Sequence, residues 1–107
     1  MDQTEADLRF GRLLANLSAT VRLLSDEGQD HWSSWMAEAR AEIAAHDSHG
    51  LTRLLSAYGG AGSFNDVWLR PRLPDQRLEQ VDAHFSQLRS ALYDDASSLL
   101  RDLERRD

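Results

Sequence analysis

Two histidines and an aspartate lie within four residues of one another, at His46, Asp47 and His49. Neutral imidazole and carboxylate groups are common donors to zinc, so these residue types could contribute to a metal site. Such a site would need another ligand from elsewhere, and Asp47-Ser48 is also typical of a turn between two helices. We favour the turn and predict neither a metal nor a cofactor.

A glycine-rich run, Gly59-Gly60-Ala61-Gly62-Ser63, is the second candidate for chemistry. If it leads into a helical turn, its free backbone amides could hold a phosphate or a carboxylate. All twelve basic residues are arginine, so the lysine that a nucleotide-binding loop requires is missing. We favour the alternative, in which Gly59 or Gly60 ends a helix and Gly62 permits a tight reversal.

Catalysis finds little support in the residue types present. The chain has no cysteine, which excludes thiolate metal sites, cysteine nucleophiles and disulfides. Serine is plentiful, but no Gly-x-Ser-x-Gly motif occurs and none of the four histidines has a recognisable catalytic context. We therefore expect a protein that is not an enzyme.

Apolar residues recur at helical spacing along most of the chain. The spacing predicts helices over residues 4–25, 30–45, 51–58 and from 75 onward. Thr4, Asp30 and Asp75 are the expected N-caps, and Gly28 the expected stop of the first helix. Between the last two helices, Ser63 could cap a turn over residues 64–66. An extended segment at residues 67–69 is the competing interpretation.

These elements predict an all-α fold, a four-helix up-and-down bundle-like domain with one glycine-rich connection and a long C-terminal helix. Residues 1–107 form one domain in this prediction. The last helix is longer than a core of this size needs, so its end is expected to protrude or pair with another copy. A bend or early stop is expected near residues 94–98.

The charge balance is acidic, with 12 basic against 18 acidic residues and a formal net charge of −6. A chain of this charge is a poor ligand for nucleic acid, whose phosphates require a basic face. No apolar run approaches the ~20 residues that cross a bilayer, so no membrane partner is expected. The first thirty residues lack the features of a secretory signal, and we expect a cytoplasmic location.

A family resemblance is carried by one segment of the chain, Tyr58-Gly59-Gly60-Ala61-Gly62-Ser63-Phe64-Asn65-Asp66, together with His31-Trp32 and Trp35 that precede it. It is similar to a family of small uncharacterised bacterial proteins built around a Tyr-Gly-Gly-x-Gly-Ser-Phe-Asn-Asp element. That family often has methionine where this chain has Ala61. The resemblance implies a shared fold and marks four positions for a shared role, namely Tyr58, Ser63, Asn65 and Asp66.

Small size, acidic helices and an aromatic loop are typical of proteins that bind other proteins. We predict a non-catalytic binding module, most concretely an immunity-type inhibitor of a basic bacterial toxin domain. Trp68 is expected to fill a partner's pocket, because an exposed indole is a frequent interface anchor. The alternatives are a small-ligand, anion or metal-binding module and a helical oligomerisation module, the latter a homodimer through the last helix. The predicted partner-binding residues are Tyr58, Ser63, Asn65, Asp66, Trp68, Asp94 and Asp95.

Overall fold

The computed structural model describes the backbone of residues 3–59, 64 and 75–106, and the side chains of residues 5–59, 64 and 80–105. Every regular element in this part of the chain is a helix, so the predicted all-α fold is confirmed. No helix within it has the length and apolar character needed to cross a membrane. The helices are α1 (Gln3–Asp26), α2 (Asp30–Ala44), α3 (His49–Ser56) and α4 (Asp75–Arg106).

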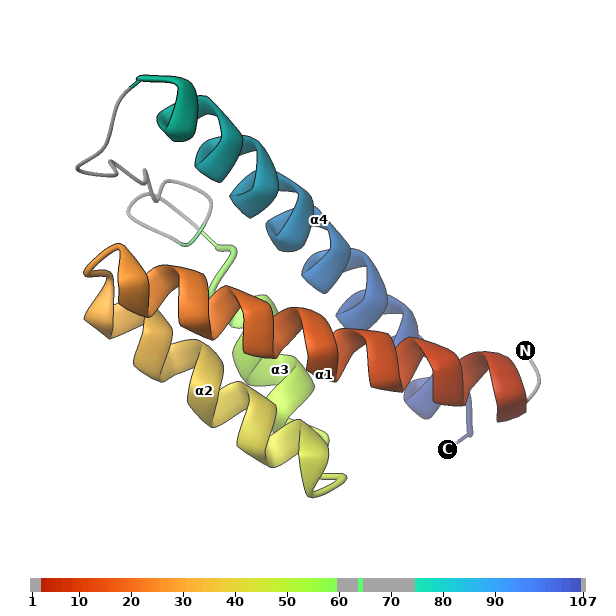
Figure 1. Cartoon of the computed structure of the whole chain (residues 1–107). Coiled ribbons are helices and arrows are strands. Elements are labelled where there is room, and N and C mark those ends of the chain that lie inside the picture. Colours follow the sequence, from red (N-terminus) through yellow and green to blue (C-terminus); the bar gives the residue numbers. More distant parts are fainter. Residues whose placement is uncertain (1–2, 60–63, 65–74, 107) are drawn as a thin grey trace.

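The four helices pack in a closed cycle of contacts (Figure 1). Helix α1 packs on α2 and on α4, and α3 packs on the other side of the same two helices. Helix α4 has 32 residues, which at ~1.5 Å per residue spans about 48 Å. The molecule's longest dimension is 49 Å, so α4 sets its length.

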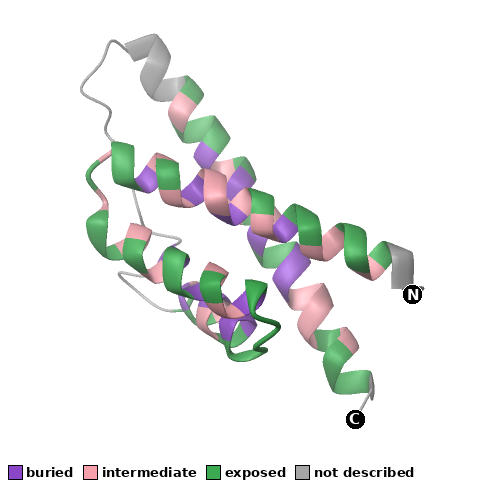
Figure 2. Ribbon diagram, turned by 60° about the horizontal axis from the view of Figure 1, so that its bottom comes forward, coloured by how far each residue is buried: buried purple, intermediate pink, exposed green. Residues whose placement is uncertain are grey.

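The core lies where the apolar faces of the helices meet, as the buried positions in Figure 2 show. The predicted helical spacing places these side chains on one face of each helix, which is why burial follows the sequence pattern. The fully buried large side chains include Leu13, Leu17, Leu24, Met36, Leu54, Phe85 and Leu92.

All three predicted N-caps lie inside their helices, and Asp75 is the first residue of α4. Thr4 was expected as an N-cap, but α1 begins one residue earlier, at Gln3. Asp30 was also expected as a cap, and it is instead the first residue of α2, with Gln29 at the cap position and no side-chain capping bond. An acid in the first turn is still favourable, because it faces the positive end of the helix dipole.

The end of α1 agrees with the prediction that Gly28 stops it. Gly28 has a φ of 75°, a left-handed conformation that glycine adopts without steric cost. The amide of Gly28 donates to the Ser25 carbonyl at 3.1 Å, and the amide of Gln29 donates to the Leu24 carbonyl at 2.8 Å. This pair of bonds is the Schellman arrangement, and it turns the chain sharply into α2.

Gly50 lies in the first turn of α3, although residues 46–50 were predicted as a turn. A Cβ atom at Gly50 would lie 2.7 Å from Cγ1 of Ile43 and 2.8 Å from the carbonyl oxygen of Ala39. Only glycine therefore lets α3 approach α2 this closely. The turn between the two helices is consequently shorter than expected.

Helix α4 continues without a break to Arg106, so the early stop expected near residues 94–98 is absent from it. Two residues of that stretch, Asp95 and Ala96, are buried against the neighbouring helices, and this burial outweighs the low helix propensity of aspartate.

Phe64 joins the connection between α3 and α4 to the core. Its side chain is fully buried, and its amide donates to the Ala57 carbonyl at 2.8 Å. Its ring centroid lies 5.3–5.4 Å from the rings of Trp32, Tyr58 and Phe85. The rest of the predicted turn at residues 64–66, its expected cap Ser63 and the competing extended segment at 67–69 lie outside the described residues.

We expect Phe64→Ala to lower the free energy of unfolding by about 3–5 kcal/mol, because it removes a buried ring and leaves a cavity. Urea denaturation followed by circular dichroism measures the change. Phe64→Leu should cost less, and Leu8→Ala, on an exposed side chain, should stay within about 0.5 kcal/mol. Equal effects of Phe64→Ala and Leu8→Ala would contradict the role assigned to Phe64.

Candidate functional site

Two of the predicted partner-binding residues, Tyr58 and Asp94, line the same open hollow on the surface. Arg89, Ser90 and Tyr93 complete its lining, and we call these five residues the tyrosine hollow. Ser63, Asn65, Asp66 and Trp68, also predicted, lie outside the described residues.

Tyr58 is held in the hollow by its hydroxyl and by its ring. The hydroxyl donates a hydrogen bond of 2.6 Å to the backbone carbonyl of Arg89. The ring meets those of Phe64 and Tyr93 edge to face, at 5.4 and 5.2 Å between centroids. Burial raises the pKa of Tyr58 well above its ordinary value, the charge of Arg89 lowers it and that of Asp94 raises it.

Arg89 connects the tyrosine hollow to the core. Its guanidinium carbon lies 4.9 Å from the ring centroid of Phe85, and Nη1 donates to the Phe64 carbonyl at 3.3 Å. A cation over an aromatic face gains electrostatic attraction from the ring quadrupole. The position of Arg89, and with it the floor of the hollow, therefore depends on the buried aromatic residues.

Ser90, Tyr93 and Asp94 form the accessible part of the hollow. Tyr93 is 47% exposed, a large fraction for an aromatic side chain in contact with another ring. Asp94 is also exposed. Tyrosine and arginine are enriched at the centres of protein interfaces, and a neighbouring carboxylate adds preference for a basic partner.

Asp95 was predicted to bind a partner together with Asp94, and the structure corrects this. Asp95 is only 4% exposed. Its Oδ1 and Oδ2 accept hydrogen bonds from Nη2 and Nε of Arg12, at 2.6 and 2.9 Å. The hydrogen bond and the charge of Asp95 raise the pKa of Arg12. Asp95 therefore joins α4 to α1 and is not part of the outer surface.

The candidate metal ligands of the α2–α3 turn make separate contacts. The ring of His46 stacks on that of Phe10, with 5.1 Å between centroids and 6° between planes. Nδ1 of His49 lies 3.0 Å from Oδ1 of Asp47, which also accepts the His49 amide. Among the side chains that the structure describes, no three potential ligands come together around a metal position.

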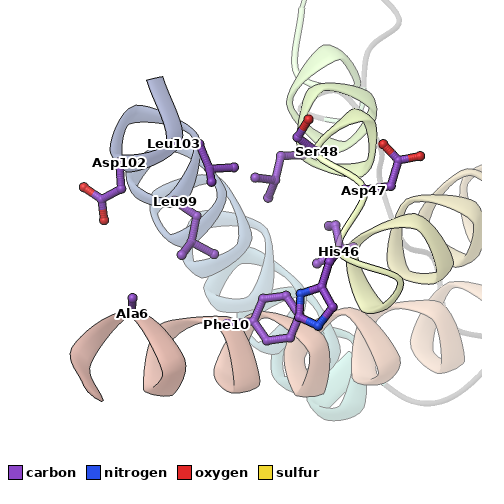
Figure 3. A pocket seen from close by; sticks show the side chains of 10 residues that line it. Ala6, Phe10, His46, Asp47, Ser48, Leu99, Asp102 and Leu103 are labelled. Atoms are coloured by element: carbon purple, nitrogen blue, oxygen red, sulfur yellow. The ribbon is translucent and has the colours of Figure 1, made fainter. Parts of the chain in front are cut away.

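A second surface feature, which the sequence did not predict, is an apolar pocket of about 190 Å³. Figure 3 shows side chains of α1, of α4 and of the α2–α3 turn around it, with Phe10 and His46 stacked at one side. The sequence signal that could have indicated this pocket is the excess length of the last helix, whose apolar stripe ends at Leu103, a residue that is 41% exposed. The apolar pocket is lined by Ala6, Phe10, Ile43, His46, Asp47, Ser48, Leu51, Leu99, Asp102 and Leu103.

One family model matches this chain, over residues 25–74, and its description is a domain of unknown function (DUF6966). No curated protein and no solved structure matches. The matched region contains residues 58–66, but the match does not test the motif resemblance, which stays a prediction.

We expect Asp95→Asn to lower the urea midpoint of unfolding, because an amide cannot replace the ion pair with Arg12. Asp94→Asn, which makes the same chemical change at the adjacent exposed position, should leave the midpoint within experimental error. Both variants are compared by equilibrium denaturation at neutral pH. If the two midpoints fall equally, Asp95 does not have the internal role assigned to it.

The raised pKa of Tyr58 predicts a loss of stability at alkaline pH. Up to pH ~10 both folded and unfolded states keep this proton, and above it the unfolded state loses the proton first. The free energy of unfolding should therefore fall as pH rises beyond about 10.

Tyr58→Phe should remove this part of the alkaline loss. At pH 7 it should cost about 0.5–1.5 kcal/mol, through the lost hydrogen bond to the Arg89 carbonyl. Denaturation at several pH values measures both effects, with Tyr93→Phe as the matched control. An unchanged alkaline slope in Tyr58→Phe would contradict the burial of this hydroxyl.

Proposed function

We propose that this protein is a non-catalytic binding module, most concretely an immunity-type inhibitor that binds a basic bacterial toxin domain through the tyrosine hollow. The observation that carries the proposal is the grouping of Tyr58, Tyr93 and Asp94 at one accessible place. Aromatic side chains bury much area at little cost in conformational entropy, which suits them to anchor a partner.

The hollow is well ordered by contacts within the chain. The bond from Tyr58 to Arg89 and the ring contact between Tyr58 and Tyr93 restrict these side chains before any partner arrives. Binding to a surface that is already ordered loses less entropy than binding to a mobile one.

Charge supports the choice of a basic partner. The formal net charge of −6 attracts cationic proteins at long range, and Asp94 supplies a carboxylate within the hollow itself. A toxin that acts on nucleic acid must present a basic surface to the phosphates. An acidic inhibitor that covers this surface would block the substrate.

The proposal is tested with the product of the gene adjacent to the one that encodes this chain. We expect a tight complex by isothermal titration calorimetry, with an affinity that falls as salt increases, and inhibition of that product's activity. Tyr93→Ala and Asp94→Arg should each weaken binding at least tenfold.

Asp82→Arg is the matched control for Asp94→Arg, because it makes the same charge change at another exposed position of α4. It should weaken binding much less. If neither hollow variant has an effect, the tyrosine hollow is not the binding surface. A melting temperature that rises with phosphate or zinc, or a mass that rises with concentration, would favour the ligand-binding or oligomerisation alternative instead.

A further inference from the structure

The apolar pocket lies away from the tyrosine hollow and shares none of its lining residues. In Figure 3, Leu99 and Leu103 of α4 point toward the gap that separates them from the α2–α3 turn, while Ala6 and Phe10 of α1 lie below. Leu99 is only half-buried and Leu103 is 41% exposed. The pocket therefore leaves apolar surface in water that a ligand could cover.

The size of the pocket limits what can fill it. Its volume of about 190 Å³ is below the range of about 300–1,000 Å³ that small-molecule and cofactor sites occupy. A cavity of about 150 Å³ already accepts a benzene ring. One large apolar side chain is therefore the occupant of matching size.

The backbone at the mouth of the pocket is strained. His46 has a φ of 61°, and it ends α2 in the position that glycine normally takes. Its amide donates to the Ile43 carbonyl at 2.9 Å, and the amide of Asp47 donates to the Glu42 carbonyl at 2.9 Å. Glycine would make the same two hydrogen bonds without strain. The stacking of the His46 ring on Phe10 at the pocket wall is the contact that offsets the backbone strain of His46.

The charged side chains that line the pocket favour a cationic neighbour. Asp47 and Asp102 are both acidic, and among the side chains that the structure describes no arginine lines the pocket. Within the described residues Asp102 makes no hydrogen bond or ion pair. Figure 3 shows its carboxylate on the outer side of α4, turned away from the gap, where a cation beside the apolar centre can reach it without displacing an internal partner. An apolar centre with acid at its edge is complementary to an apolar side chain flanked by arginine or lysine.

We propose that the apolar pocket binds one large apolar side chain of a protein segment that carries an arginine or lysine beside it. The pocket is a second contact surface, and the inference does not require the tyrosine hollow to bind anything. A partner that uses both surfaces would gain affinity from each.

The test uses the full chain labelled with ¹⁵N and a synthetic peptide, acetyl-Gly-Arg-Ala-Phe-Ala-Arg-Gly-amide. We expect the peptide to shift the amide resonances of Phe10, His46, Leu99 and Leu103 in a saturable way. Replacing both arginines of the peptide by glutamate should weaken binding at least threefold, and replacing its phenylalanine by alanine should abolish it.

Two pairs of variants locate the effect in the pocket. Ala6→Leu fills the pocket from α1 and should abolish the shifts, whereas Ala15→Leu, at an exposed position of the same helix, should preserve them. Asp102→Asn should reduce the protein's preference for the arginine peptide over the glutamate peptide by about twofold or more, and Glu104→Gln should leave this preference unchanged. The Glu104 control accounts for the acidity of the protein as a whole.

Three results would overturn the proposal. The first is a peptide that shifts no pocket resonance, and the second is one that binds Ala6→Leu as well as the native chain. The third is a concentration-dependent shift of the pocket resonances with no peptide present, which would make a second copy of this chain the occupant. None of these variants changes Tyr58 or Asp94. A failure of the peptide to bind the apolar pocket is therefore distinguishable from a failure of a partner to bind the tyrosine hollow.

Discussion

The burial of Phe64 is the constraint on which the candidate site depends. Helix α3 has only eight residues, too few to be stable without packing, and its C-terminal end leads directly to Tyr58. Phe64 fixes this end twice, by the hydrogen bond from its backbone amide to the Ala57 carbonyl and by its ring contact with Tyr58. Its carbonyl accepts from Arg89, so the same residue also positions the α4 side of the tyrosine hollow. Tyr58, and through its ring contact Tyr93, is thus held by a residue that has no exposed surface.

The helices themselves were predictable because their cores are made from a regular pattern. Leu13, Leu17 and Leu24 recur at helical spacing, and all three are fully buried in α1. The ends were less predictable, because capping is a choice between nearby residues of similar chemistry. Thr4 and Asp30 are both good capping types, yet each lies inside its helix. Gly28 was predicted correctly, since few other residues adopt its left-handed conformation.

The candidate site was predictable only in part, and Asp94 and Asp95 show why. Consecutive residues of a helix point in directions about 100° apart, so one of two adjacent acids can face the core while the other faces water. The buried one, Asp95, pairs with Arg12, 83 residues away in the sequence. A local pattern of charges contains no information about such a distant partner. The apolar pocket escaped prediction for the same reason, because its walls come from three separate segments.

The apolar pocket follows from the unequal lengths of the helices. Helix α4 has 32 residues and α3 has eight, so α3 can cover only part of the face that α4 presents. Leu99 and Leu103 continue the apolar stripe of α4 toward its C-terminal end, where Ala6 and Phe10 of α1 supply only part of the cover. The same stripe that builds the core at Phe85 and Leu92 therefore becomes exposed surface at Leu103. A long amphipathic helix in a small bundle presents such a surface whether or not a partner is bound, and the acids at its edge then determine which partners can approach.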